Sequence, residues 1–272
     1  MKLKYHLANK LFSSALSNIM PGYLRKILLK NQKIRFIPTK LNSLPQNNYP
    51  ISPNIDDQIN VINKFSETQK EVTYKTYPKL VNLLEKIYSK DEKFNFLDFG
   101  GEEIDQYLIL KKKFKNINYF VINKKEFNEI FDKLLEKYNY KNLFFLKNLN
   151  EILNNEYDFI NFGSVLQYID DYDFILEKIL IKSKKYILIS GIHLFKNDLL
   201  KDKYVVKQMN LWPKKPYLYF FNFNHFTKKF MKNNFKINFE NKNESDVINY
   251  ENFELEKINN TRYTDILFKN KN

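Results

Sequence analysis

The placement of glycine is the feature that most constrains the fold of this chain. Only 5 of the 272 residues are glycine, and four of them follow apolar runs that read as buried strands. These are Gly100 and Gly101 after 94–99, Gly163 after 157–162, and Gly191 after 186–190. A chain poor in glycine is expected to keep it where a side chain would clash. Ligands bind at the carboxyl ends of strands in open α/β sheets, so the glycines predict a small-molecule site along that edge.

Alternating strand and helix patterns fill the chain from residue 94 onward. Apolar runs that predict strands cover 94–99, 117–122, 142–146, 157–162, 185–190, 235–240 and 262–269. Helical spacing of apolar residues covers 102–115, 125–138, 171–183 and 224–234. Repeated strand–helix units predict a parallel sheet, and the last two strands predict an antiparallel hairpin. We therefore expect an α/β fold with a Rossmann-like, mostly parallel sheet of seven strands, and we read 192–222 as less regular.

The first 90 residues predict a helical N-terminal region that precedes an α/β domain over 91–272. Residues 56–89 have helical spacing, and we expect Pro78 to start or kink the second part of this segment. Residues 38–55 contain four prolines together with several Asn and Ser residues. This composition predicts an extended linker or a loop that wraps over the surface.

Residues 1–30 read as a helix that is interrupted at Pro21 and Gly22. The apolar stretch is weak and broken by Lys10, so we expect no signal peptide. Nowhere does the chain approach the roughly 20 uninterrupted apolar residues of a membrane span. A short amphipathic helix here would suit contact with a membrane surface, and packing on its own domain is the alternative.

The absence of cysteine removes disulfides, thiolate metal ligands and cysteine nucleophiles. Together with the expected lack of a signal peptide, it predicts a cytoplasmic protein. The only histidines are His6, His193 and His225, and neither their spacing nor that of the carboxylates suggests a metal centre. We therefore expect no metal ion.

The formal net charge of +14 raises the question of a nucleic-acid partner. Arginine reads phosphates and guanine bidentately, but it occurs only at Arg25, Arg35 and Arg262, and lysine supplies the other 42 basic residues. The chain is also rich in Asn, Ile, Phe and Tyr, which share A/T-rich codons with lysine. A genome-wide bias explains this composition, so we expect no nucleic-acid partner. A mild preference for anionic partners stays open.

Three strand ends offer groups that would suit a small ligand. Gly100 and Gly101 let a ligand approach the backbone and the N-terminus of the next helix. Asn123 follows the second strand, where nucleoside-binding sheets commonly hold the ribose, and a simple turn residue is the alternative. Small residues within 163–169 would let an adenine-sized ring lie flat against the loop. The motifs G-x-G-x-x-G and G-x-x-x-x-G-K-[ST] are absent, which argues against hydride-transfer enzymes and P-loop NTPases.

The order LDFGG, a second strand, YDFINFGSVLQYI and then YILIS resembles the class I S-adenosylmethionine-dependent methyltransferases. More narrowly, the chain is similar to a group of candidate methyltransferases often associated with bacterial surface-polysaccharide genes. That group has a D-F-G-G turn followed by a tyrosine, an S-S-V-L-Q-Y-like segment, and a later Gln before a Pro/aromatic stretch. The resemblance covers residues 75–268.

The resemblance implies S-adenosylmethionine as the cofactor and a set of site residues. It implies cofactor binding by Asp98, Gly100, Gly101, Tyr107, Asn123, Ser164, Val165 and Gln167. It implies substrate binding by Tyr168, Gln208, Trp212 and Tyr217. The departures from the family pattern are Ile104 in place of a third glycine, the pair Glu102 and Glu103, and Asn123 in place of an acidic residue. The Glu pair would stabilise a helix N-terminus but repel the carboxylate of the cofactor.

His193 and His225 are the candidate catalytic residues. Methyl transfer to a hydroxyl needs a base with a pKa near the working pH, which suits histidine, and the transfer itself depends mostly on holding two reactants in line. His193 follows the strand over 185–190, and His225 begins the helix after the aromatic segment 212–223. A hydrogen-bonded loop histidine and a helix-capping histidine are the alternatives. The aromatic segment either covers an acceptor sugar or lipid, or packs in the core.

The sequence therefore predicts a methyltransferase-like domain over 91–272 that transfers a methyl group from S-adenosylmethionine to a hydroxyl of a sugar, glycan or related small molecule. The sugar class follows from the resemblance alone. One alternative is a degenerate member of the fold that serves as a binding or scaffolding subunit, because the departures weaken cofactor binding. A second alternative is an RNA methyltransferase or RNA binder, which the net charge motivates.

Overall fold

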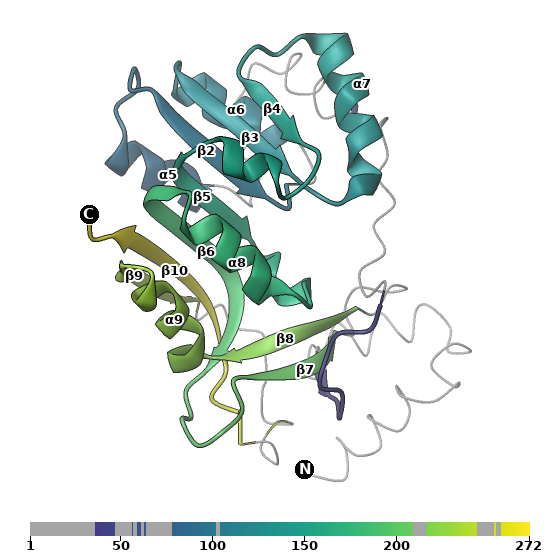
Figure 1. The fold of residues 1–272 in the computed structure, drawn as a ribbon, viewed down its shortest axis with the longest axis vertical. Helices are drawn as coiled ribbons and strands as arrows, with labels where there is room; N and C mark the ends of the chain where they lie inside the picture. Colours follow the sequence, from purple (N-terminus) through teal and green to yellow (C-terminus); the bar gives the residue numbers. More distant parts are fainter. Residues whose placement is uncertain are drawn as a thin grey trace.

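The computed structural model describes residues 36–46, 56, 59–60, 63, 78–101, 104–208, 216–243, 253 and 257–272. These residues build a ten-stranded sheet with helices packed on both of its faces (Figure 1). Five parallel strands form its centre in the order β4-β3-β2-β5-β6, and a C-terminal hairpin and three further strands join it at β6.

The five parallel strands coincide with the apolar runs of the sequence. They are β2 (Phe94–Phe99), β3 (Ile117–Ile122), β4 (Leu143–Leu146), β5 (Tyr157–Gly163) and β6 (Ser183–Phe195). A strand that is covered on both faces has a nearly continuous apolar sequence, which is why these segments could be recognised. The predicted parallel sheet is confirmed.

Helices connect the parallel strands as the periodicity predicts. They are α5 (Pro78–Ile87), α6 (Asp105–Lys113), α7 (Asn128–Tyr138) and α8 (Tyr172–Leu180), with 3-10 turns η1 (Lys125–Phe127), η2 (Glu151–Asn154) and η3 (Leu166–Tyr168). Pro78 begins α5, because the first helical position needs no N–H donor. None of the helices in the described segments is long and apolar enough to cross a membrane.

The C-terminal hairpin is also confirmed. It consists of β9 (Phe235–Asn243) and β10 (Arg262–Asn270), which pair antiparallel, and β10 pairs antiparallel with β6. The helix α9 (Phe223–Lys232) precedes it, and the Asn222 side chain caps this helix by accepting from two backbone N–H groups. The sheet β4-β3-β2-β5-β6-β10-β9 is thus the expected seven-stranded, mostly parallel unit.

Three strands were not predicted. They are β1 (Phe36–Pro38), β7 (Lys203–Gln208) and β8 (Tyr217–Asn222), and they extend the sheet from β6 in the order β8-β7-β1. The interpretation of 192–222 as irregular is therefore wrong. Strand β6 continues past Gly191, and Leu194 and Phe195 pair with β8. The prolines between β7 and β8 concealed this hairpin in the sequence.

The segment that was read as a proline-containing linker begins as a sheet edge. Phe36 pairs with Gln208 and Pro38 with Val206, so a proline lies on the outermost strand, where its missing N–H does no harm. Beyond the strand, the Thr39 hydroxyl donates to the Val205 carbonyl oxygen at 2.7 Å. Residues 1–35 and most of 47–77 lie outside the described residues.

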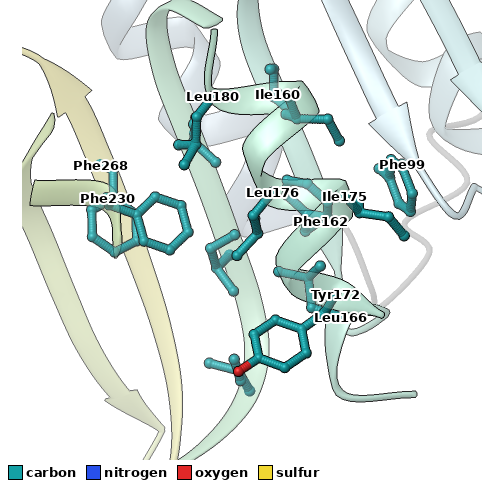
Figure 2. Close-up of a cluster of buried hydrophobic side chains, with 14 of the residues drawn as sticks. Phe99, Ile160, Phe162, Leu166, Tyr172, Ile175, Leu176, Leu180, Phe230 and Phe268 are labelled. Carbon is teal, nitrogen blue, oxygen red and sulfur yellow. The ribbon is translucent and has the colours of Figure 1, made fainter. Parts of the chain in front are cut away.

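Two layers of buried side chains lie on the two faces of the sheet. Alternate residues of β2 point to opposite faces, so Leu97 joins the layer beneath α8 and α9, whereas Phe96 joins the layer beneath α5, α6 and α7. Figure 2 shows the first layer, in which Leu176 of α8 lies over Phe162 of β5 and Phe230 of α9 stacks on Phe268 of β10. This packing fixes the carboxyl ends of β2, β3, β5 and β6 along one edge.

Candidate functional site

The glycine turn after β2 is held close to the loop after β5. Gly100 has a φ of +83°, and its N–H donates to the Ile122 carbonyl oxygen at 2.8 Å. A Cβ at Gly100 would lie 2.6 Å from Val165 Cγ2, and a Cβ at Gly101 would clash with Asp98 Oδ2. Both glycines are therefore required for the turn to close over its neighbours. The turn itself stays half-buried at the sheet edge.

Asp98 lies beneath this turn and is fully enclosed. The Tyr119 hydroxyl donates to its Oδ2 at 2.7 Å, and Asn161 Nδ2 donates to its Oδ1 at 3.0 Å. Gln106 Nε2 donates in turn to the Tyr119 hydroxyl at 2.8 Å. Burial raises the pKa of the Asp98 carboxyl, and the hydrogen bonds oppose this rise. The carboxyl thus supports the turn from inside the protein.

Tyr107 is buried as well, on α6. Its ring lies 5.5 Å from that of Tyr119 and 5.4 Å from that of Tyr140. Burial raises the pKa of its hydroxyl to about 12. The structure therefore places this predicted cofactor residue in the core layer under α6 and not on the open edge.

Asn123, at the end of β3, is tied to the glycine turn. Its Nδ2 donates to the Gly101 carbonyl oxygen at 2.8 Å, and its Oδ1 accepts from the Lys124 backbone N–H at 2.7 Å. Both functions of the amide are thus engaged within the protein. A ribose at this strand end would have to share these groups or displace them.

The loop after β5 brings three predicted residues together. Ser164 has a φ of +57°, and its N–H donates to the Ser190 carbonyl oxygen at 2.9 Å. Val165 packs on Gly100, as described above. Gln167 Nε2 donates to the Ser164 carbonyl oxygen at 3.4 Å, whereas its buried Oε1 has no hydrogen-bond partner in the described structure. An orphaned buried acceptor is the kind of atom that a ligand donor would satisfy.

His193 lies just beyond this loop, inside an aromatic enclosure. Its ring stacks on Phe220 at 4.7 Å and meets the edge of Phe36 at 4.8 Å, and Tyr263 lies 5.0 Å away. Only 2% of the residue is exposed. The candidate base is therefore close to the predicted edge but covered by side chains from β1, β8 and β10.

Two predicted substrate residues meet directly. The Tyr168 hydroxyl donates to Gln208 Oε1 at 2.6 Å, which joins η3 to β7. Tyr217, at the start of β8, is half-buried, and Lys207 Nζ lies 5.5 Å from the centre of its ring. Trp212 lies outside the described residues.

His225 is separate from this group. It is exposed in the first turn of α9, and its backbone N–H contacts the capping Asn222 side chain. Among the described residues, no cluster of three or more His, Asp or Glu side chains could hold a metal ion.

A surface hollow of about 530 Å³ runs along β4, the edge strand of the parallel part of the sheet. Its lining includes Asn95 and Asn118, at the amino ends of β2 and β3, and Phe144 of β4. The two asparagine side chains hydrogen bond to one another at 3.0 Å. None of the residues that line it belongs to the glycine turn or to the loop after β5.

Sequence reasoning missed two positions of the site. Tyr263 of β10 places its hydroxyl 3.2 Å from Ser164 Oγ, and Phe36 contacts His193 from the N-terminal segment. Neither belongs to a recognisable motif, because each reaches the site through the pairing of strands that are distant in sequence. The pairing of β10 with the predicted strand β6 was the only available signal for Tyr263.

Comparisons with known proteins show the fold. No family model matches the chain, and no curated protein matches it. A candidate sarcosine dimethylglycine methyltransferase from Galdieria sulphuraria is 13% identical, with a TM-score of 0.51 over 70% of this chain and 82% of its own. The 1,6-didemethyltoxoflavin-N1-methyltransferase of Burkholderia thailandensis is 12% identical, with a TM-score of 0.48 over 87% of this chain and 95% of its own. The fold is thus the Rossmann-like fold of methyltransferases. Because one fold can carry many functions, the function of this chain has to be argued from the residues of the site.

Proposed function

We propose that the protein is an S-adenosylmethionine-dependent methyltransferase that acts on a hydroxyl of a sugar, glycan or related small molecule. The observation that carries the proposal is the convergence, at the carboxyl edge of a methyltransferase-type sheet, of the Gly100–Gly101 turn, Asn123 and the loop over 163–167. Within that group, Gln167 Oε1 is a buried acceptor without a partner. The solved methyltransferase with bound S-adenosylhomocysteine is consistent with this cofactor class.

The residues at this edge carry the types of chemical group that binding of the cofactor would require. Amide and hydroxyl groups of Asn123 and Ser164 suit ribose and methionine atoms, and Val165 offers an apolar surface for the adenine ring. The turn is half-buried at the sheet edge, although the Gly100 N–H and the Gly101 carbonyl already form hydrogen bonds within the protein. Asp98 would act from below by holding the turn in shape.

When bound, S-adenosylmethionine supplies an electrophilic methyl group. The protein then has to hold an acceptor hydroxyl in line with that methyl group and receive its proton. His193 is the candidate base, and a change in the packing of Phe36 or Tyr263 would be needed to open it to the acceptor. No role in the reaction is assigned to His225, which is exposed at the start of α9.

The sugar class rests on the sequence resemblance and on the character of the neighbouring side chains. Tyr168 of η3 bonds to Gln208 of β7, whereas Tyr217 begins β8 and packs against the layer on the other face of the sheet. Aromatic rings and amides together are typical of surfaces that bind sugar faces and hydroxyls. We propose Tyr168 and Gln208 as the acceptor-binding group, with Tyr217 as a contact from the other face of β8.

A binding or scaffolding subunit with the same fold is the second candidate. It is favoured by the engagement of both Asn123 functions within the chain and by the side chains that fill the space next to Gly100 and Gly101. These contacts leave the turn closed upon itself. A protein that lost its cofactor would be expected to close the turn in this way.

Isothermal titration calorimetry with S-adenosylmethionine and S-adenosylhomocysteine tests the proposal. We expect dissociation constants in the micromolar range for the parent, with a binding free energy of about −8 kcal/mol at 1 μM. Asn123→Ala should weaken binding by loosening the turn, and Gly101→Arg should abolish it. Because a side chain at Gly101 also clashes with Asp98, the unfolding temperature of that variant is recorded beside the titration. No heat at millimolar ligand from a folded parent would favour the scaffolding subunit.

If the cofactor binds, radiolabelled methyl transfer tests the acceptor class. Neutral sugars, phosphorylated sugars and structured RNA are compared as acceptors in separate reactions. Label in the neutral sugars alone supports the proposal. Transfer to RNA would replace it with the alternative that the net charge suggests.

A further inference from the structure

Strand β6 continues past its parallel partner β5, and two hydroxyls meet above the backbone at that point. The last β5–β6 pair joins Gly163 and Ser190, and the next residue, Gly191, has a φ of +64°. Ser164 Oγ and Tyr263 OH lie 3.2 Å apart. A Cβ at Gly191 would clash with both oxygens, so the hydroxyls can converge only because this residue is glycine.

Two further irregularities of the backbone lie at the same place. Ser164 has a φ of +57°, which is uncommon for a residue with a side chain. The pairing of β10 with β6 shifts register between Thr264 and Ile266, one residue beyond Tyr263. Bulges and unfavourable backbone conformations persist where the surroundings hold them, and they are frequent at ligand sites. Together with the positive φ of Gly191, these two irregularities set the positions of Ser164 Oγ and Tyr263 OH.

A buried acceptor without a partner among the described residues lies on the same loop as Ser164. Gln167 is 3% exposed, and its Nε2 donates to the carbonyl oxygen of Ser164 itself. Its Oε1 has no hydrogen-bond partner among the described residues. Leaving a buried carbonyl unsatisfied is unfavourable, so a ligand with a hydrogen-bond donor would suit this atom.

We propose that Ser164, Tyr263 and Gln167 Oε1 form a subsite that holds the acceptor's hydroxyl group beside the methyl group to be transferred. This inference rests on the proposed function, assigns the side chains of Ser164 and Gln167 to the acceptor instead of the cofactor, and adds Tyr263 to the binding residues. Ser164 can donate to the Ser190 carbonyl oxygen, and Tyr263 to Ser164, which leaves mostly acceptor lone pairs facing a ligand. The ligand group must therefore bring a donor, as a hydroxyl does.

The Asp265 carboxylate next to the subsite disfavours anionic ligand groups. Asp265 Oδ1 accepts from the Gly191 N–H at 2.8 Å, and its Oδ2 lies 3.7 Å from Lys79 Nζ. The lysine side chain is 67% exposed, so its charge is largely screened by solvent. A carboxylate or phosphate at the subsite would face acceptor oxygens and a nearby carboxylate. A neutral hydroxyl, or a cationic donor, has no such conflict.

The subsite also determines which side chains a ligand meets before it reaches His193. Ser164 and Tyr263 are half-buried, whereas His193 is 2% exposed and its ring lies 5.0 Å from that of Tyr263. A ligand that enters along the sheet edge therefore meets the tyrosine before the histidine. Tyr263 is therefore the binding residue that lies between the entering ligand and His193.

Sinefungin provides a probe that needs no knowledge of the acceptor. It is an analogue of S-adenosylmethionine that carries an amino group at the place of the transferred methyl, whereas S-adenosylhomocysteine has nothing there. An ammonium group beside the subsite would donate to Gln167 Oε1 and Tyr263. We expect the parent to bind sinefungin about 10- to 100-fold more tightly than S-adenosylhomocysteine, the range for a hydrogen bond to a charged group.

Calorimetric titrations of three variants with both ligands complete the test. Gln167→Met and Tyr263→Phe should lose most of the preference for sinefungin while their affinity for S-adenosylhomocysteine changes less than about threefold. Gln167→Met should also unfold at no lower temperature than the parent, because it removes a buried unsatisfied carbonyl. Tyr138→Phe, on α7 and distant from the subsite, is the matched control and should keep the preference.

Each other outcome overturns the subsite. An equal loss of both ligands would assign these side chains to the cofactor itself, and an unchanged preference in both variants would show that they meet no ligand. If the folded parent binds neither ligand, the proposed function fails and the subsite falls with it. If S-adenosylhomocysteine binds but sinefungin has no advantage, only the subsite is refuted.

Discussion

The Tyr168 hydroxyl donates a 2.6 Å hydrogen bond to Gln208 Oε1, across 40 positions of sequence. Tyr168 belongs to η3, directly after the loop that packs on the glycine turn, and Gln208 ends β7 in the added part of the sheet. Gln208 also pairs with Phe36 of β1. The bond therefore links the proposed cofactor loop to the strands that flank His193, and it gives the added strands a direct part in the proposed acceptor side.

We expect Tyr168→Phe to lower the free energy of unfolding by about 1 kcal/mol, the net contribution of one hydrogen bond. If the protein is active, the Michaelis constant for the acceptor should rise more than that for the cofactor. Urea unfolding measures the first effect. Tyr204→Phe on β7 is the control, and its ring packs on Phe195 at 5.6 Å. Equal losses in the two variants would show that the bond to Gln208 is not what stabilises this junction.

Substitution by alanine should destabilise the protein strongly at Gly191 but hardly at Gly163. Gly191→Ala forces a side chain into a φ of +64° and against Ser164 and Tyr263, so we expect a loss of about 2–4 kcal/mol in unfolding free energy. At Gly163 a Cβ would meet only Asn161 Nδ2 at 3.5 Å, an ordinary contact. Gly163→Ala should therefore change stability by less than about 1 kcal/mol, and it can raise it by restricting the unfolded chain. Similar losses in both variants would contradict this assignment.

Patterns within short segments predicted most of the fold. The apolar runs of β2, β3, β5 and β6 are continuous because both faces of these strands are buried. The strands β1, β7 and β8 escaped prediction because their pairing depends on the length of β6 beyond Gly191. That length is not encoded in a local pattern, since proline and glycine near a strand end are also typical of loops.

The candidate site was predictable only where a motif lies on one strand end. The Gly100–Gly101 turn and the loop with Ser164 and Val165 do lie together, as the sheet order requires. Tyr107 illustrates the limit, because its place in the sequence motif gives no indication that its side chain points into the core. Tyr263 illustrates the converse, since a residue without a motif reaches the site through the register of β10 against β6.

Asp98 should make the protein less stable as the pH rises. Its pKa is raised in the folded state because the carboxyl is buried, so the folded chain holds the proton more tightly than the unfolded chain. Stability is then lost as the pH rises from the ordinary value of 3.8 toward the folded pKa. Urea unfolding of the parent and of Asp98→Asn at several pH values between about 4 and 8 isolates this contribution. The parent should lose stability relative to the variant over that range, whereas a constant difference would show that Asp98 does not titrate differently on folding.

Asp170 should have the opposite pH dependence. Its pKa is lowered because the Tyr219 hydroxyl donates to the carboxylate, with a further bond from the Leu44 N–H at 3.0 Å. The stabilisation is complete above the ordinary pKa of 3.8 and is lost as the pH falls through the lowered folded value. Asp170→Asn should therefore be less stable than the parent near neutral pH, with a difference that closes below about pH 4. Tyr219→Phe should reduce the same pH dependence, because it removes the principal donor and leaves the carboxylate in place. A difference between parent and Asp170→Asn that persists in acid would mean that the substitution costs stability for a reason other than the charge of this carboxylate, and would contradict the assignment.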